Sequence, residues 1–456
     1  MSVVPGSIET DRQPPMTIPL RHFLLAQVLL VAGVVAGIAD AMGQVAGFAT
    51  AAQLHLLLAG WVCVTIMGAM TQFVPVWSGV ELHSRRFAAA QLWLVLLGLA
   101  GFATGLLTAR IELLLPFGTV MALGFWTFVY NVGRTLADAR PLDVTERHFA
   151  IALGFFLLVT GFGILLALSL RRPVFADLPV ARADAVAAHA TLAVFGAVLT
   201  TVFGALYQLA TMFTQTELHG VDLHLQRFEA AGYPLGVLAL AGGRLFAIEW
   251  LALAGGLVVL ASVLAVAAIL ARRLLETTVP WTPMLSRYAV AVPAFGLWAI
   301  LTVPVWVADP LAADATLGAP GTDLLLTMGG IGFVVFGTLY HVVPFVIWVH
   351  RYSDLLGFED VPMIDDLYDD RIARIDLLFL VAGVLGLVAG DLAALEPRVL
   401  ATGGIALGVG VLAFGWNLLA VIRRHGPHSL PEILFSIGGA GGRTDGERTA
   451  EEVTDA

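Results

Sequence analysis

The chain lacks lysine and has almost no cysteine. All 24 basic residues among its 456 residues are arginine, a bias from which we draw nothing mechanistic. The single cysteine, Cys63, excludes an internal disulfide and any metal cluster held by several thiolates. Charged residues are scarce too, at 13% against about 25% in ordinary soluble domains. With so little charge and no basic patch, we expect no nucleic-acid partner.

Most residues of the chain are hydrophobic. They form 59% of the chain, and the mean hydropathy is +0.88. Apolar runs of about 20 residues, the length needed to cross a bilayer, recur along the whole sequence. We therefore predict an all-α integral membrane protein whose main partner is the lipid bilayer. The twelve candidate transmembrane spans are 22–43, 50–77, 87–108, 112–134, 149–170, 185–213, 229–246, 249–271, 288–308, 324–349, 375–391 and 399–421.

The arginines predict how these spans are oriented. An even number of spans places both termini on one side of the membrane. The N-terminus, the loops after even-numbered spans and the C-terminus hold 18 arginines, and the loops after odd-numbered spans hold 6. Those six are Arg110, Arg171, Arg172, Arg182, Arg244 and Arg398. Because positively charged loops stay inside, we predict a multi-pass protein of the cell (plasma) membrane with both termini in the cytoplasm.

The second, sixth and tenth spans resemble one another. When Gly68, Gly204 and Gly337 are aligned, the segments that follow read GAMTQFVP, GALYQLAT and GTLYHVVP. The loop GVELHSRRFAAA at 79–90 recurs as GVDLHLQRFEAA at 220–231. The aligned glycines lie 136 and 133 residues apart (68 to 204, 204 to 337), which is four spans each.

This spacing predicts three four-helix pseudo-repeats, at about 22–134, 149–271 and 288–421, arranged as a threefold ring. The alternative is a chance similarity among membrane helices rich in small residues. The membrane domain would cover 22–424. A cytoplasmic N-terminal tail (1–21) would precede it, and a disordered acidic cytoplasmic tail (425–456) would follow it.

Three of the eleven histidines lie well inside predicted spans: His55, His189 and His341. The others lie at span ends or in loops, where we expect solvated or interfacial side chains. An ionisable side chain inside a span is a functional candidate. In the common register His55 and His189 stand 13 and 15 residues before their glycines, so their depths differ by only about 3 Å. His341 lies roughly 25 Å deeper.

Two imidazoles at one depth, on spans of neighbouring repeats, suit a bis-histidine haem, which needs an axial nitrogen on each face of its iron. Its propionates would point toward the outer water layer. The arginines available there are Arg171, Arg172, Arg182 and Arg398. The alternative is a pair of buried histidines bonded to nearby carbonyls or hydroxyls. Copper suits the pair less well, because no cysteine or methionine is adjacent.

A second group of candidates lies near the inner face. Tyr340 and His341 could form a proton relay or second site with His350 or with the acidic loop at 359–370. Alternatively, they are polar groups bonded across a helix contact. We favour this second interpretation, because the other two repeats carry a glutamine at the position of His341.

Residues 53–84 resemble a known family. They are similar to the tenth helix of subunit I of the haem–copper oxidases, and most similar to the C-family cytochrome c oxidases and the nitric oxide reductases. The matching positions are Gln53-Leu54-His55, Gly60-Trp61, Gly68-Ala69, Val74-Pro75, Gly79 and Ser84. The resemblance implies that His55 ligates the low-spin haem. The sixth span is similar to the family's second helix, which implies that His189 is the other axial ligand.

The departures from the family are as informative as the matches. The family's high-spin haem ligand is replaced by Gln53, and no span contains the paired histidines that help to bind copper. The resemblance therefore implies a divergent member without the binuclear centre and without catalytic residues. We expect a membrane haem-b protein with one low-spin haem, used for electron transfer or gas sensing, and no copper.

Such a protein would exchange electrons with a redox partner subunit, a cytochrome or a cupredoxin. Two alternatives remain open from the sequence. One is an active terminal oxidase or nitric oxide reductase subunit. The other is a cofactor-free transporter or assembly factor on the same scaffold.

Overall fold

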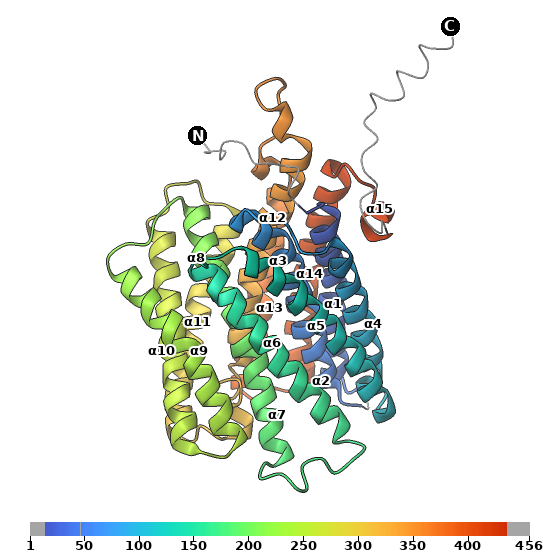
Figure 1. Ribbon diagram of the computed structural model, residues 1–456, viewed down its shortest axis with the longest axis vertical. Helices are drawn as coiled ribbons and strands as arrows, with labels where there is room; N and C mark the ends of the chain where they lie inside the picture. Colours follow the sequence, from blue (N-terminus) through green and yellow to red (C-terminus); the bar gives the residue numbers. More distant parts are fainter. Residues whose placement is uncertain (1–13, 46, 436–456) are drawn as a thin grey trace.

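The structure is a computed structural model that describes residues 14–45 and 47–435. In this part of the chain, eleven helices are long and apolar enough to cross a membrane. One further long helix, α9 (Val221–Leu245), carries Asp222, Glu229 and Arg244. The long helices run side by side (Figure 1), and the predicted all-α membrane fold is confirmed.

The elements follow one another in three similar groups. The first group is α1 (Thr17–Ala41), α2 (Ala49–Leu54), η2 (His55–Val62), α3 (Cys63–Ser78), α4 (Arg85–Leu107), η3 (Ile111–Leu113) and α5 (Leu114–Asp138). The second is α6 (Val144–Leu168), α7 (Arg182–Thr191), η4 (Leu192–Leu199), α8 (Thr200–Thr214), α9 and α10 (Glu249–Leu275). The third is α11 (Pro283–Ala308), η5 (Ala313–Ala315), η6 (Leu325–Gly332), α12 (Phe333–Arg351), η7 (Ser353–Leu355), η8 (Ile364–Asp366), α13 (Asp370–Leu392), α14 (Pro397–His425) and the short α15 (Leu430–Phe435).

The helix contacts recur from group to group. Helix α1 packs against η2 and α3, α6 against η4 and α8, and α11 against η6 and α12. The pairs α4–α5, α9–α10 and α13–α14 also pack together. The groups are joined by α5 against α6, α10 against α11, and α14 against α1, which closes the ring. The threefold arrangement of four-helix pseudo-repeats stays a prediction.

The central spans share an irregularity. Elements η2, η4 and η6 are π-helices of eight residues each. Relative to Gly68, Gly204 and Gly337, they begin 13, 12 and 12 residues earlier (68 − 55, 204 − 192, 337 − 325). Because π-helices are rare and concentrate at functional sites, three of them within one residue of the same register position are a feature that the predicted repeats share.

The aligned glycines explain how the central spans approach their neighbours. A Cβ on Gly68 would lie 2.6 Å from Cβ of His22 on α1, and a Cβ on Gly204 would lie 2.5 Å from Cβ of His148 on α6. Both separations are shorter than van der Waals contact, so only glycine permits these crossings. His22 and His148 are each only 1% exposed, which corrects our expectation that histidines at span ends are solvated or interfacial.

The outer surface of the bundle is apolar. Many large hydrophobic side chains of the long helices are exposed, among them Leu235 (67%), Trp250 (71%) and Leu412 (60%). In water such a surface would promote aggregation, whereas in a bilayer it contacts acyl chains. The structure therefore supports lipid as the surroundings of this bundle.

Several predicted boundaries differ from the structure. Helix α1 begins at Thr17 rather than at 22, and α9 begins at Val221 rather than at 229. The tail that we expected to be disordered from 425 contains α15, whose Ile433 is fully buried. The carbonyl of Ile433 accepts a hydrogen bond of 2.6 Å from Nε of Arg21 on α1, which holds α15 against the bundle. The rest of both predicted tails, residues 1–13 and 436–456, lies outside the described residues.

The acidic loop and the helix that contains His189 lie at opposite ends of the bundle. In Figure 1 the loop between α12 and α13, which contains the acidic segment 359–370, lies at the upper end. Helix α7 and the loop that precedes it lie at the lower end. His189, in α7, is thus near the end of the bundle opposite the acidic loop.

Candidate functional site

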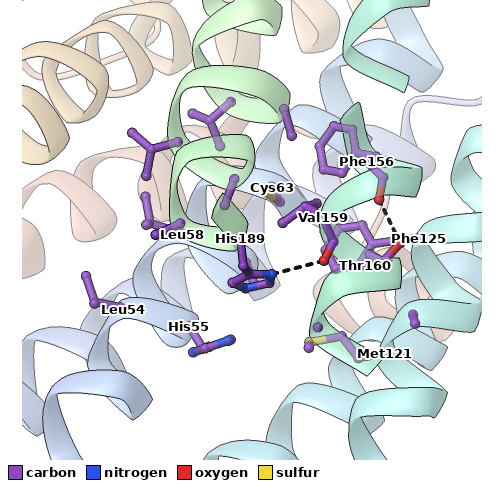
Figure 2. A pocket seen from close by; sticks show the side chains of 18 of the residues that line it. Leu54, His55, Leu58, Cys63, Met121, Phe125, Phe156, Val159, Thr160 and His189 are labelled. Carbon is purple, nitrogen blue, oxygen red and sulfur yellow. Dashed lines mark hydrogen bonds between the residues drawn. The ribbon is translucent and has the colours of Figure 1, made fainter. Parts of the chain in front are cut away.

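The structure brings His55 and His189 together. His55 is the first residue of η2, and His189 lies in α7, which belongs to the next group of helices. Their ring centroids are 6.5 Å apart, and the ring planes are inclined by only 22°. Figure 2 shows the two rings facing each other at the edge of a cavity. The equal depth expected from the sequence register is therefore matched by direct proximity.

Backbone carbonyls fix the orientation of both rings. Nδ1 of His55 lies 2.7 Å from the carbonyl oxygen of Ala51, and Nδ1 of His189 lies 3.0 Å from that of Val159 (Figure 2). A carbonyl only accepts, so Nδ1 of each ring carries the proton and, in the neutral ring, Nε2 keeps its lone pair. Histidines that bind metals are typically held in this way.

The separation of the rings can be compared with that of two axial ligands. An imidazole nitrogen binds a first-row metal such as zinc at about 2 Å. Two imidazoles that held one such ion between them would have their ring centres roughly 6 Å apart. The centroids of His55 and His189 are 6.5 Å apart, close to that spacing.

A cavity of about 180 Å³ adjoins the two histidines. Its walls come from η2, α4, α5, α6, α7 and η4, and nearly all of its lining side chains are apolar. Small residues line it at Ala59, Gly163 and Ala193, and aromatic rings at Phe102, Phe125 and Phe156. One polar neighbour, Thr160, is occupied by a hydrogen bond of 2.7 Å to the carbonyl of Phe156. Its lining therefore suits a flat apolar macrocycle beside the two imidazoles.

Gln53 stands at the position where the haem–copper oxidases carry the ligand of their high-spin haem. The side chain of Gln53 packs against Gly37 on α1, where a Cβ would lie 2.2 Å from its Nε2. Further along η2, the ring of Trp61 contacts Phe336, which in turn contacts Phe414, each at 4.8 Å between centroids. Between η2, α12 and α14 the structure thus has packed aromatic rings.

A copper centre would need several ligands close together. Among the described residues, no group of three or more histidine, cysteine, aspartate or glutamate side chains is placed to hold a metal ion. Besides the two imidazoles, the side chains that line the cavity include two sulfur donors, Cys63 and Met121, although the sequence had shown no cysteine or methionine adjacent to the histidines. The absence of copper stays a prediction.

The four arginines predicted to meet haem propionates are all exposed, and none of them lines the cavity. Arg171 donates to the carbonyl of Glu112, and Nε of Arg182 donates to Oγ of Ser169 at 3.0 Å. Arg172 follows Arg171 in the loop after α6, and Arg398 lies in the first turn of α14. Their role toward a haem stays a prediction.

Sequence reasoning missed a fifth arginine. Arg244, in the last turn of α9, is 2% exposed and donates to the hydroxyl of Thr191, two residues after His189. We had counted it only as a loop charge. Its burial depends on helix packing, and nothing in its sequence neighbourhood distinguishes it from the other outer arginines.

The inner-face candidates do not form one relay. The hydroxyl of Tyr340 donates to Asp376 on α13 and accepts from Nδ2 of Asn417 on α14 at 3.1 Å. Asp376 also forms a fully buried ion pair with Arg287 on α11. Tyr340 thus joins a network that ties four helices of the third group together. The interpretation of Tyr340 and His341 as polar groups bonded across a helix contact was argued from the position of His341, and it stays a prediction.

His341 and His350 have separate surroundings. The ring of His341 contacts Phe213 at 4.2 Å and Phe345 at 5.9 Å. Nδ1 of His350 lies 2.8 Å from the carbonyl of Val346, one turn earlier on its own helix. Among the described residues, the hydrogen bonds of Tyr340 and His350 thus lead to different partners.

The second group of helices has a comparable buried network. Glu229 on α9 is fully buried and accepts a hydrogen bond of 2.6 Å from the hydroxyl of Tyr207 on α8. Nε2 of His148 on α6 lies 3.1 Å from the same carboxylate. The sequence showed the three residues, but their meeting depends on tertiary packing between α6, α8 and α9.

Comparison with known proteins shows the fold. No family model matches the sequence, and no curated protein is similar to it in sequence. Among solved structures, the chain is similar to a haem–copper terminal oxidase studied as a dimer by electron cryo-microscopy, with a TM-score of 0.67. The similarity covers 90% of this chain and 84% of that one, at 13% identity.

The chain has the haem–copper terminal oxidase fold. This supports the resemblance of residues 53–84 to a helix of that superfamily, which we had inferred from short motifs. Similarity at 13% identity shows the fold alone, so which residues of this haem–copper oxidase-like chain bind a cofactor has to be argued from its own side chains.

Proposed function

We propose that the protein is a membrane haem-b protein in which His55 and His189 are the two axial ligands of one low-spin haem. The observation that carries this proposal is the facing pair of imidazoles, 6.5 Å apart at the edge of an apolar cavity. Both Nδ1 atoms are committed to carbonyls. The two Nε2 atoms make no hydrogen bond to any described residue, and a metal ion gives them a partner.

When bound, the haem supplies one-electron chemistry, and with both axial positions filled it transfers electrons rather than activating a substrate. The chain holds the ligands in place through the carbonyls of Ala51 and Val159. The apolar lining of the cavity excludes water and lowers the local dielectric, two of the means by which proteins set a haem potential. Electron transfer or gas sensing is the role that this arrangement supports.

The position of the histidines suggests where electrons enter. They lie near the end of the bundle that the arginine distribution places on the outer side of the plasma membrane. A redox partner subunit, a cytochrome or a cupredoxin on that side would exchange electrons with the haem over a short distance. We propose no copper centre, because Gln53 stands at the position of the family's high-spin haem ligand and no span contains paired histidines.

An absorption spectrum tests the proposal. Protein purified from haem-replete cells should show sharp reduced haem-b bands and one haem per chain. His55→Ala and His189→Ala should each lose the low-spin spectrum. His341→Ala is the matched control, because this histidine also lies in a central span but packs against Phe213 and Phe345. A colourless wild-type protein, or an unchanged spectrum in either ligand variant, would contradict the proposal.

The fold supports a second candidate, an active terminal oxidase or nitric oxide reductase subunit, because the similar solved structure is a terminal oxidase. This candidate requires a second haem and copper. Metal and haem analysis of the same preparation separates the two: two haems and one copper per chain favour the enzyme, and one haem favours our proposal.

A further inference from the structure

Arg244 is a buried cation whose hydrogen-bond partners are all neutral. Its side chain is 2% exposed, at the end of α9 that lies beside α7. The acceptors are the carbonyl of Pro310 (3.2 Å from Nε), the hydroxyl of Thr191 and the carbonyl of Thr316 (2.8 and 2.9 Å from Nη1), and the carbonyl of Ala315 (3.5 Å from Nη2). The guanidinium also lies 5.0 Å from the ring centre of Trp306.

Two other buried arginines are each neutralised by a buried carboxylate. Arg273 pairs with the buried carboxylate of Asp222 at 2.8 Å, and Arg287 pairs with that of Asp376. Among the described residues, no carboxylate forms an ion pair with Arg244. A buried charge without a counter-charge is costly, and within membrane spans such charges are typically functional.

Two partners of Arg244 lie next to the proposed haem site without lining its cavity. Thr191 is two residues from His189 in α7, and Thr316 directly precedes Leu317, which lines the cavity. The ring of Trp306, which faces the guanidinium, also contacts Phe195 in η4 at 5.9 Å. Arg244 therefore ties the helix that carries His189 to the segment at the rim of the cavity.

We propose that Arg244 is a positioning residue of this site and the fixed positive charge that raises the reduction potential of the iron. This inference rests on the proposed bis-histidine haem. The oxidised iron carries one more positive charge than the reduced iron, so a nearby cation disfavours the oxidised form. Burial keeps solvent ions from screening Arg244, and no neighbouring carboxylate pairs with it.

The size of the effect follows from Coulomb's law. For unit charges separated by on the order of 10 Å at an effective dielectric of about 20, the interaction changes the ratio of reduced to oxidised haem by on the order of tenfold. For a one-electron couple, a tenfold change corresponds to about 59 mV.

Two pairs of variants separate charge from structure. Arg244→Gln removes the charge, whereas Arg244→Lys keeps the charge but loses the planar fork of donors. Thr191→Asp leaves Arg244 in place and gives it a counter-charge where the hydroxyl now accepts its hydrogen bond, whereas Thr191→Asn is a neutral side chain of the same shape. Arg110→Gln, an exposed arginine of another outer loop, controls for solvent-screened charge.

The readout is a spectroelectrochemical titration of each purified holoprotein, together with its absorption bands. We expect Arg244→Gln and Thr191→Asp each to lower the potential by about 59 mV, a tenfold shift toward the oxidised form. Arg244→Lys, Thr191→Asn and Arg110→Gln should stay within about threefold of the wild type. The bands should keep their positions, since both axial ligands remain.

Each outcome bears on one proposal. An unchanged potential in Arg244→Gln or in Thr191→Asp overturns the electrostatic role, as does an equal fall in Thr191→Asn. An equal fall in Arg244→Lys shows that only the fork of donors matters. If Arg244→Gln does not fold, the comparison of Thr191→Asp with Thr191→Asn still tests the electrostatic role of Arg244. A wild-type protein without haem overturns the proposed function instead, so the two failures are distinguishable.

Discussion

At the scale of single residues, the cavity beside His55 and His189 depends on small side chains in its lining. Gly163 on α6 lines the cavity, and a Cβ added there would lie 3.4 Å from Cε1 of His189. A larger side chain at this position would extend into the space beside the imidazole. Gly161, two residues earlier on the same helix, has open space around its Cβ position and does not line the cavity.

These two glycines give a matched pair of variants. We expect Gly163→Leu to abolish haem incorporation, because the branched side chain occupies part of the apolar cavity, and Gly161→Leu to retain it. The measurement is the haem-to-protein ratio after purification, with thermal unfolding in detergent to show that both variants fold. Full haem content in Gly163→Leu would mean that the cavity is not the haem site.

The sequence predicted only part of this site. His55 and His189 could be found because an imidazole in hydrocarbon is unusual and because both stand at one depth in a repeated segment. Arg244 and the carbonyl of Val159 could not be found. A charged side chain near a helix end is ordinarily solvated, so the burial of Arg244 is not expected from the sequence. Every residue has a backbone carbonyl, so the sequence does not indicate which one accepts a hydrogen bond from His189.

At the scale of elements, side chains from one helix hold the beginning of another. Asn131 on α5 bonds both the N–H and the carbonyl of Ser84, at 2.9 and 3.1 Å. Asn417 on α14 bonds the N–H and the carbonyl of Asp369 in the same way, at 3.0 and 2.9 Å. Ser84 and Asp369 are the N-cap residues of α4 and α13, so each asparagine fixes where its neighbouring helix begins.

We expect Asn131→Ala and Asn417→Ala each to lower the free energy of unfolding by about 1–3 kcal/mol, because each leaves the N–H of an N-cap residue without a partner. The carbonyls of both N-cap residues keep the hydrogen bonds that they accept from the N–H groups of Ala88 and Ala373. The two sites belong to different groups of helices, so their effects should add in the double variant. Denaturant titration in detergent measures all three. A double variant no less stable than either single one would indicate that the helix starts are held by other contacts.

The buried ion pair between Arg287 and Asp376 joins α11 to α13. Asp376→Ala would leave the guanidinium of Arg287 buried without a counter-charge, which costs about 3–5 kcal/mol. A lower midpoint of thermal unfolding in detergent should report this loss. The double variant Arg287→Met, Asp376→Leu should recover most of it, because an apolar pair of similar volume needs no desolvation. An Asp376→Ala protein as stable as the wild type would contradict this account.

Element boundaries and helix pitch were less predictable than element type. Apolar runs identified the spans because a bilayer requires about 20 such residues. The π-helical stretches were not predicted, since the buried central spans are apolar on every side and carry no periodic pattern that separates one helical pitch from another. Helix α15 was missed because six residues of a polar tail hold no such pattern, and its order depends on the contact with Arg21.

At the scale of the whole molecule, the ring is closed between the first and the last long helix. Nε2 of Gln27 on α1 donates to the carbonyl of Val411 on α14 at 3.1 Å. A Cβ on Gly404 of α14 would lie 2.9 Å from Ile38 of α1, so the two helices approach closely. Residues far apart in sequence thus complete the ring, and the third group contributes Leu317 to the lining of the cavity beside His55 and His189.

The orientation of this ring in the membrane decides on which side the proposed haem site would lie. The arginine distribution predicts that the loop between α6 and α7 is outside and that the acidic loop between α12 and α13 is inside. The structure places these loops at opposite ends of the bundle (Figure 1). Cys63 is buried, and after Cys63→Ala a single introduced cysteine can report which side each loop faces.

We expect Ala176→Cys, in the exposed loop before α7, to react with a membrane-impermeant maleimide in intact cells. Asp360→Cys, in the acidic loop, should react only after the membrane is permeabilised. Both positions are exposed in the structure, so a difference between them reports the membrane and not burial. The reverse pattern would place His55 and His189 near the cytoplasm, and an electron donor on the outer side would then have to reduce the haem across most of the bilayer.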